Sequence, residues 1–167
     1  MSNGKIGALQ SLCAFAAGIV LLGLQAATAA DRQAEVRQAA GQFYAALNVL
    51  FTGDVAPMLA VWSHADDVTY MGPLGGLLVG WVAVRASWEG QANSKLGGRV
   101  KPEALRVIAT ESMGITVGYE RGTNNVNGKP VRVDIRATNI FRREDGRWKM
   151  IGHHTDVFSW LKLEGEK

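Results

Sequence analysis

The sequence predicts a single α+β domain in which three N-terminal helices cover one face of an antiparallel sheet. Apolar residues at helical spacing recur in residues 31–92, whereas β-rich runs separated by turn residues fill residues 99–156. Helices that precede a run of hairpin-connected strands are typical of this class. No internal repeat or second domain is indicated, so we expect one domain over residues 31–160 and a C-terminal tail over residues 161–167.

The first thirty residues predict a secretory signal peptide. Lys5 precedes an apolar run over residues 12–24, and small residues follow over residues 26–30. The order of a charge, an apolar run and small residues is that of a cleavable signal. The run is shorter than the roughly twenty residues that a helix needs to cross a bilayer, so an uncleaved anchor is the lesser alternative. We expect cleavage near Ala29 or Ala30, a periplasmic or secreted protein, and no stable membrane anchor.

The composition of the remaining chain excludes several functional classes. Removing residues 1–30 leaves 17 Lys and Arg against 15 Asp and Glu, a net charge of 17 − 15 = +2. That charge is too small to indicate a nucleic-acid partner. The only cysteine, Cys13, lies in the signal segment, which excludes thiol chemistry in the mature domain. The three histidines lack the spacing of a zinc site, so we expect neither a metal nor another cofactor.

The first half of the mature chain predicts three helices. Apolar residues three and four positions apart indicate a helix over residues 31–51. Proline in the first turn indicates a short second helix over residues 57–63, with Trp62 facing inward. A third helix is expected over residues 80–92, with Trp88 on its apolar side.

The strands are expected between and after these helices. Residues 66–71 alternate as a strand does, and residues 77–79 form a short returning strand. A hairpin is expected from the β-rich runs 99–110 and 114–122. Residues 122–130 are polar and rich in turn-forming residues, so we expect a loop there.

The loop of the closing hairpin, residues 131–156, decides which side chains share a face. Shifting the pairing by one residue turns every side chain to the other side of the sheet. If residues 145–146 alone form a two-residue loop, Arg136 faces away from His154. If residues 144–146 form a three-residue loop, Arg136 lies opposite His154, and we favour this second register.

The favoured register produces one face that changes from apolar near the turn to ionisable at the far end. This face would consist of Asp134, Arg136, Thr138, Ile140, Trp148, Met150, Gly152, His154 and Asp156. Such a gradient suits the inner wall of a conical pocket, closed by Trp148 and Met150 and polar at its mouth.

The closing hairpin carries the motif Arg136-Ala137-Thr138, followed by a basic pair, Asp145-Gly146-Arg147-Trp148 and His154. In this motif the chain resembles the SnoaL-like branch of the nuclear-transport-factor-2-like superfamily. Weaker similarity covers Trp62, Asp66-Asp67-Val68, Gly72-Pro73, Gly80 and Trp88. Family members commonly carry a polar residue or histidine where this chain has Gly152, which removes a possible acid or base.

The resemblance, over about residues 35–158, implies a curved sheet wrapped around the helices and a conical cavity. It also implies that the outer sheet face is often used for dimerisation, so we expect a homodimer. The superfamily includes ketosteroid isomerases and the association domain of calcium/calmodulin-dependent kinase II, as well as dehydratases, hydrolases and plain binding domains. The fold therefore does not choose the activity.

Three residues are candidate catalytic groups. His154 could act as a general base or hydrogen-bond donor, because imidazole titrates near neutrality. Asp134 could form an acid and base pair with Asp156, although Arg136 between them favours an ion-pair network or a grip on a carboxylate ligand. The resemblance to ketosteroid isomerases makes Asp67 the third candidate, as the carboxylate that moves a proton.

The expected ligand-binding residues are mostly aromatic. Tyr70 could donate its hydroxyl to an oxyanion or pack in the core. Binding residues are expected at Trp62, Tyr70, Trp88, Arg136, Trp148, Met150 and Asp156. The sequence therefore predicts an exported protein that binds a small, partly apolar molecule without turnover. The alternatives are a cofactor-free isomerase or lyase using His154 with Asp134 or Asp67, and a homo-oligomerisation domain.

Overall fold

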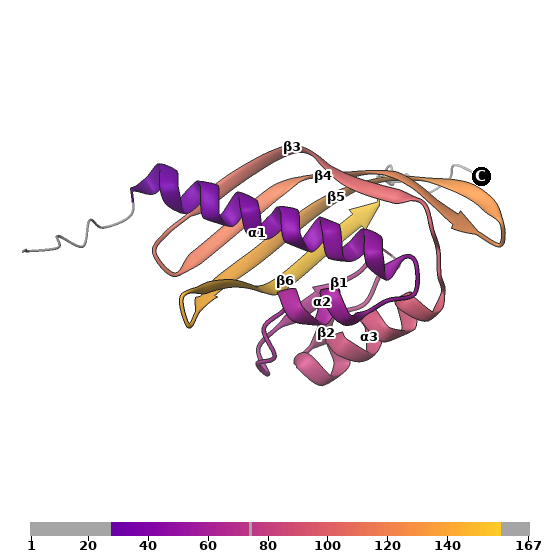
Figure 1. The fold of residues 1–167 in the computed structure, drawn as a ribbon, viewed down its shortest axis with the longest axis horizontal. Helices are drawn as coiled ribbons and strands as arrows, with labels where there is room; N and C mark the ends of the chain where they lie inside the picture. The colour runs from indigo at the N-terminus through magenta and orange to yellow at the C-terminus, as the bar shows by residue number, and fades with distance from the viewer. Residues whose placement is uncertain (1–27, 74, 158–167) are drawn as a thin grey trace, which may run out of the picture.

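The computed structural model describes residues 28–73 and 75–157 as an α+β fold (Figure 1). The helices are α1 (Ala29–Leu50), α2 (Ala56–Val61) and α3 (Trp81–Asn93). The strands are β1 (Thr69–Met71), β2 (Leu78–Val79), β3 (Arg99–Ala109), β4 (Met113–Val126), β5 (Lys129–Glu144) and β6 (Arg147–Val157). The signal segment up to residue 27 and the tail from residue 158 lie outside the described residues.

Helix α1 provides the layer that covers the sheet. Thr28 begins it with a capping box, in which the Thr28 hydroxyl accepts from the backbone of Asp31 and the Asp31 carboxylate accepts from Thr28. This arrangement satisfies amides that the first helical turn leaves unpaired. Phe43 and Leu50 are fully buried on its inner side. In Figure 1, α1 runs across the long strands, while α2 and α3 lie beside β1 and β2.

The sheet is curved and has the strand order β2-β1-β6-β5-β4-β3. Every neighbouring pair is antiparallel except β1 and β6, which run parallel. The predicted class is confirmed, with this one parallel pair as the difference. Parallel neighbours need a long connection between them, and here most of the domain lies between β1 and β6.

The loop expected over residues 122–130 is instead the tip of a hairpin. Strand β4 continues to Val126 and pairs with β5 from Lys129 onward. Asn127 and Gly128 form the connection and have φ angles of 52° and 74°. Two consecutive positive φ angles are typical of a type I′ turn, for which Asn-Gly is the preferred sequence. The loop prediction was wrong, because it rested on the polar composition of the whole segment and not on the turn preference of Asn127-Gly128.

The register favoured for the closing hairpin is also wrong. Glu144 pairs with Arg147, so Asp145 and Gly146 alone form the loop, with φ angles of 48° and 75°. Farther along, the register shifts by one residue, because Ile151 has no partner between the pairs at Met150 and Gly152. A β-bulge of this kind turns the subsequent side chains of one strand over relative to the other.

The bulge brings Arg136 and His154 to the same face, but that face is the outer one. Arg136 pairs with Asp156 and Thr138 with His154, whereas the neighbouring pair Asn139 and His153 is buried on the helix side. Alternate residues of a strand point to opposite faces, so His153 and His154 cannot both point inward. The expectation of a shared inner pocket at Arg136 and His154 is therefore wrong, and His153 takes the inner position.

Gly114 allows α1 to approach the sheet closely. A Cβ at this position would lie 2.4 Å from Cγ2 of Val36, which is fully buried. We expect Gly114→Ala to lower the free energy of unfolding by about 1 to 3 kcal/mol through overpacking. Gly90 has nothing within 4 Å and lies exposed in α3, so Gly90→Ala should raise stability by about 0.5 to 1 kcal/mol. Urea unfolding of both variants checks this, and equal effects would contradict the assigned helix position.

Candidate functional site

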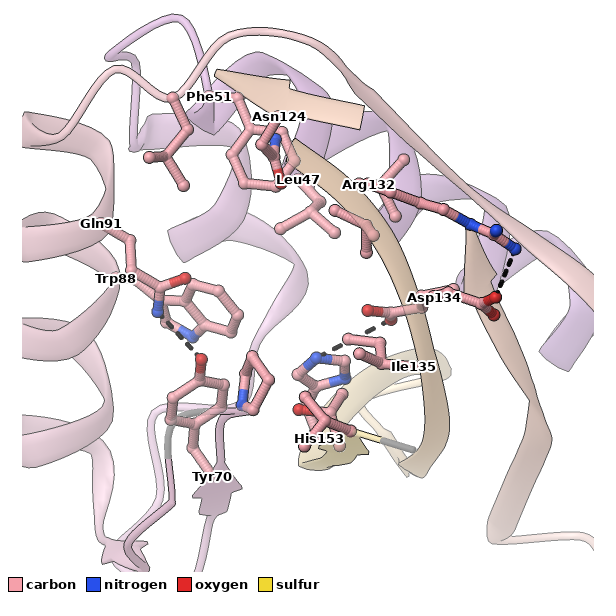
Figure 2. A pocket seen from close by; sticks show the side chains of 17 residues that line it. Leu47, Phe51, Tyr70, Trp88, Gln91, Asn124, Arg132, Asp134, Ile135 and His153 are labelled. Atoms are coloured by element: carbon pink, nitrogen blue, oxygen red, sulfur yellow. Dashed lines mark hydrogen bonds and ion pairs between the residues drawn. The ribbon is translucent and has the colours of Figure 1, made fainter. Parts of the chain in front are cut away.

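A cavity of about 590 Å³ lies between the inner sheet face and the helices (Figure 2). Its wall consists of Leu47, Phe51, Tyr70, Pro73, Trp88, Gln91, Leu96, Val100, Glu120, Asn124, Arg132, Val133, Asp134, Ile135, His153, Thr155 and Val157. Figure 2 shows Trp88 and Gln91 on α3, facing Ile135 and His153 on the strands across the cavity. Most of these side chains are apolar, as is common for sites that bind small organic molecules.

A buried carboxyl and a buried imidazole lie within this apolar wall. Glu120 on β4 and His153 on β6 are each only 3% exposed. The Oε1 atom of Glu120 is 3.8 Å from Nε2 of His153 and has no hydrogen-bond partner among the described residues. A buried carboxyl oxygen without a partner is uncommon, since leaving it unsatisfied costs about 1 to 3 kcal/mol.

Burial shifts the pKa values of the two groups in opposite directions. Loss of water raises the pKa of Glu120 to about 7, and the hydrogen bond from Tyr44 opposes this only partly. Burial also lowers the pKa of His153 to about 3, with a smaller contribution from the neighbouring His154. Desolvation disfavours whichever form carries the charge, so an acid becomes weaker and a base becomes weaker as well. At neutral pH His153 is uncharged, and both the neutral and the ionised form of Glu120 are accessible.

A chain of buried polar groups holds His153 in place. Oδ1 of Asn139 lies 2.6 Å from Nδ1 of His153. The Asn139 amide donates to the hydroxyl of Tyr44 at 3.2 Å and to that of Thr116 at 3.1 Å. The chain links α1, β4, β5 and β6, because these four residues point inward from those elements. It leaves the other ring nitrogen of His153 facing Glu120.

Aromatic rings form the wall beside His153. Trp88 is 1% exposed, and its ring centroid lies 4.7 Å from that of Tyr70 and 6.0 Å from that of His153. Tyr70 faces His153 because β1 pairs in parallel with β6 at these two residues. Gln91, one turn along α3 from Trp88, donates to the Tyr70 hydroxyl at 3.0 Å. A flat ligand could stack in this part of the cavity.

Comparison with known families places this chain in a defined group. A model of the SnoaL-like domain matches residues 4–158. The chain belongs to the SnoaL-like domain family. F-box protein SKIP8 of Arabidopsis thaliana is 30% identical over 101 residues, which are 60% of this chain and 41% of that protein. The SnoaL-like chain thus matches less than half of this relative's length.

Solved structures agree with the family. A domain from Thiobacillus denitrificans, provisionally named a calcium/calmodulin-dependent protein kinase type II association domain, is 27% identical with a TM-score of 0.62. That match covers 74% of this chain and 94% of the other. A provisionally named dehydratase of the NTF2-like family from Streptomyces avermitilis has 22% identity and a TM-score of 0.70, over 79% and 100% of the chains. The second comparison shows the fold alone, and the predicted superfamily is confirmed.

Of the predicted site residues of the SnoaL-like domain, Tyr70, Trp88 and Asp134 contribute to the cavity wall. The carboxylate of Asp134 is bonded to Arg121 at 2.9 Å and to Arg132 at 2.6 Å, the second of which Figure 2 shows. These cations lower the pKa of Asp134 and keep it ionised. A carboxylate held in this way is a poor acid or base, so Asp134 is better suited to shaping the rim.

Three predicted residues lie on the outer sheet face, away from the cavity. Arg136 donates twice to Asp156, at 2.8 and 2.6 Å, and His154 Nε2 lies 2.9 Å from the Thr69 hydroxyl. They surround a separate depression of about 460 Å³. Their predicted place in the cavity is wrong, because the two-residue loop puts Arg136 on the outer face and the bulge at Ile151 turns His154 and Asp156 to that face as well. Any ligand that they contact would lie in this outer depression.

The other predicted residues serve packing or surface ion pairs. Trp62 and Met150 are fully buried in the core. Trp148 is only partly buried, and its indole donates to Glu35 of α1 at 2.9 Å. Asp67 is exposed and accepts from Arg142 at 2.6 Å, which lowers its pKa. None of these four residues lines the cavity.

Three residues that the sequence interpretation missed carry the polar chemistry of the cavity: Glu120, Asn139 and His153. The alternation of β4 would not have found Glu120, since the apolar Ile115, Val117 and Tyr119 have the opposite parity, although Glu120 is on the buried side. Within residues 28–73 and 75–157, no group of three His, Cys, Asp or Glu side chains could hold a metal ion. No helix in that part of the chain is long and apolar enough to cross a membrane.

Proposed function

We propose that this SnoaL-like domain binds a small, partly apolar organic molecule in the cavity beside Glu120 and His153. The observation that carries this proposal is the partnerless Oε1 of Glu120 within a mainly apolar cavity of about 590 Å³. A bound molecule with one polar group would satisfy that oxygen and place its apolar part against Tyr70 and Trp88. Such a cavity is large enough for a molecule of metabolite size.

Blocking the cavity tests this proposal. Val133→Trp would fill the cavity from β5, whereas Val82→Trp places the same bulk on the outer side of α3, where the valine is 82% exposed. Native mass spectrometry of protein purified from an expressing cell should detect a co-purified small molecule in wild type and Val82→Trp, and none in Val133→Trp. Retention of the molecule in Val133→Trp, with the fold intact by circular dichroism, would place binding elsewhere.

Proton transfer at carbon is the second candidate function, and the pKa of Glu120 near 7 favours it. A general acid or base works best when its pKa lies near the working pH, because both protonation states are then accessible. Glu120 would take the role first expected of His154, Asp134 or Asp67. No cofactor is needed, since a carboxylate can move a proton between carbons adjacent to a carbonyl group.

Deuterium incorporation separates turnover from binding alone. In D₂O at pH 7, the enzyme would accelerate exchange at the carbon next to the carbonyl of 2-tetralone, which NMR follows directly. Glu120→Gln should abolish the acceleration while leaving the fold intact, and Glu89→Gln on the surface of α3 should not. Exchange no faster than in buffer alone would contradict the enzymatic function, and the binding function would still stand.

A homodimer formed through the outer sheet face is the proposed assembly. Ile108, at 60% exposed, and Val117 are apolar residues on the outer faces of β3 and β4. The similar domain from Thiobacillus denitrificans is named for association, which adds support. Val117→Glu should convert a dimer to a monomer in size-exclusion chromatography with light scattering. A monomeric wild type would exclude this assembly.

Export is proposed on the sequence of residues 1–30. A cleaved signal would leave a mature chain that starts near Asp31, whereas an anchor would leave the chain at full length. The intact mass of the protein in the envelope fraction, compared with that in the cytoplasm, distinguishes these outcomes. Full-length protein in the cytoplasm alone would contradict export.

A further inference from the structure

The Asn139 side chain determines which nitrogen of His153 carries hydrogen. Its amide nitrogen has two hydrogens, and it donates to two hydroxyls, those of Tyr44 and Thr116. Its oxygen is therefore the atom 2.6 Å from His153 Nδ1. An amide oxygen can only accept, so Nδ1 must carry the hydrogen. The tautomer of a histidine follows from the hydrogen bond that one ring nitrogen makes.

The second nitrogen of His153 is consequently a bare acceptor. The ring is 3% exposed, and burial lowers its pKa, so the imidazole stays neutral and holds a single hydrogen. Nε2 faces Glu120 Oε1 at 3.8 Å, which is too long for a direct hydrogen bond. Both atoms belong to residues of the cavity wall, so a ligand atom could lie beside both.

Glu120 is a hydrogen donor when it is protonated. The groups that face it are His153 from β6 and Tyr44 from α1, and Tyr70 from β1 is close enough to interact with it electrostatically. No lysine or arginine is among the groups that shift its pKa. A neutral carboxyl in this position offers one O–H, and the neighbouring imidazole offers one lone pair.

We propose that the cavity selects neutral ligands bearing a hydroxyl group, an alcohol, phenol or enol, which donates to His153 Nε2 and accepts from the carboxyl of Glu120. A hydroxyl is the group that both donates and accepts at a single atom. This inference rests on the proposed binding function and specifies its ligand class. An ether could use only Glu120, and a carboxylate would offer no hydrogen to Nε2.

The tautomer can be measured without a ligand. Nitrogen-15 NMR of protein labelled in histidine distinguishes a ring nitrogen that carries hydrogen from one that does not. His64→Gln and His154→Gln assign the signals, since His64, His153 and His154 are the three histidines of the sequence. The expected result is a hydrogen on Nδ1 of His153 and a bare Nε2 at pH 6 to 8. A hydrogen on Nε2 would overturn the inference.

Three matched probes measure the selectivity. Calorimetric titrations at pH 6 use 2-naphthol, 2-methoxynaphthalene and 2-naphthoate, which share one ring system and differ in the polar group. We expect 2-naphthol to bind at least about tenfold more tightly than either other probe, the effect of one or two good hydrogen bonds. His153→Phe should remove the preference, and His154→Phe on the outer face should retain it.

The outcomes distinguish a failure of the hydroxyl selectivity from a failure of the proposed binding function. Equal affinity for the three probes, or tighter binding of 2-naphthoate, would overturn the hydroxyl selectivity and leave a binding cavity. If no probe binds up to its solubility limit and no molecule co-purifies, the proposed binding function fails and the selectivity fails with it. If His153→Phe does not fold, the NMR measurement and the wild-type titrations still decide the question.

Discussion

Replacing Trp88 with alanine is expected to lower the free energy of unfolding by about 3 to 5 kcal/mol, the range for removing a large buried aromatic side chain. Trp88 is 1% exposed and lies within 6.3 Å, between ring centroids, of Phe43, Trp62, Tyr70 and His153. Its loss would open space between α3 and the sheet that these rigid rings cannot fill. Urea unfolding followed by circular dichroism measures the change.

Two matched variants test the cause of this effect. The indole Nε1 of Trp88 has no hydrogen-bond partner among the described residues, so Trp88→Phe keeps much of the packing and removes an unsatisfied donor. Its cost should be clearly smaller than that of alanine. Trp148→Ala should also cost less, since Trp148 is only partly buried at the end of the hairpin. A loss of less than about 1.5 kcal/mol in Trp88→Ala would mean that α3 does not pack as described.

The helices and the aromatic wall could be predicted because they depend on local patterns. The apolar spacing that placed Trp88 on the inner side of α3 requires only the period of a helix. Tyr70 likewise follows from the alternation of a short strand. Both residues line the cavity, although no neighbour of either could be named from the sequence.

The polar part of the site could not be predicted because it depends on two compensating irregularities. The closing loop has one residue fewer than the favoured register assumed, and Ile151 adds one unpaired residue farther along. A bulge leaves little mark in composition, and its energy comes from packing across the sheet. The choice between His153 and His154 as the inward residue therefore required the coordinates.

Glu120 shows a second limit of sequence interpretation. A glutamate in a strand is usually exposed, and nothing adjacent to it in the chain indicates burial. The residues that surround it, Tyr44 and His153, are distant in sequence and meet only through the packing of α1 on the sheet. Its pKa near 7 is a property of that assembly.

The pH dependence of stability is expected to show opposite contributions from Glu120 and His153. Folding raises the pKa of Glu120 from 4.5 to about 7, so its contribution is full below pH 4.5 and is lost as the pH rises to 7. The loss is about 3 kcal/mol. Folding lowers the pKa of His153 from 6.5 to about 3, so its contribution is full above pH 6.5 and is lost as the pH falls to 3, by about 5 kcal/mol.

Between pH 4.5 and 6.5 the two contributions should cancel in the wild-type protein. The unfolded chain then holds one proton on imidazole, and the folded chain holds one on the Glu120 carboxyl, so the pair binds the same number of protons in both states. Stability depends on pH only where that number differs between the states. Folding therefore moves a proton from one group to the other with no net uptake by the pair.

Single variants should reveal the two pH dependences of stability that cancel in the wild-type protein. Relative to wild type, Glu120→Gln should gain about 3 kcal/mol as the pH rises from 4.5 to above 7, because the variant has no carboxyl to ionise. His153→Phe should gain stability relative to wild type as the pH falls from 6.5 toward 3, because the variant has no imidazole that can take up a proton on unfolding. Urea titrations across this range measure both differences, with Glu89→Gln as the control for loss of a surface carboxylate. Parallel profiles for Glu120→Gln and wild type would mean that Glu120 is ionised in the folded protein, and the hydrogen-donor role assigned to it in the cavity would be lost.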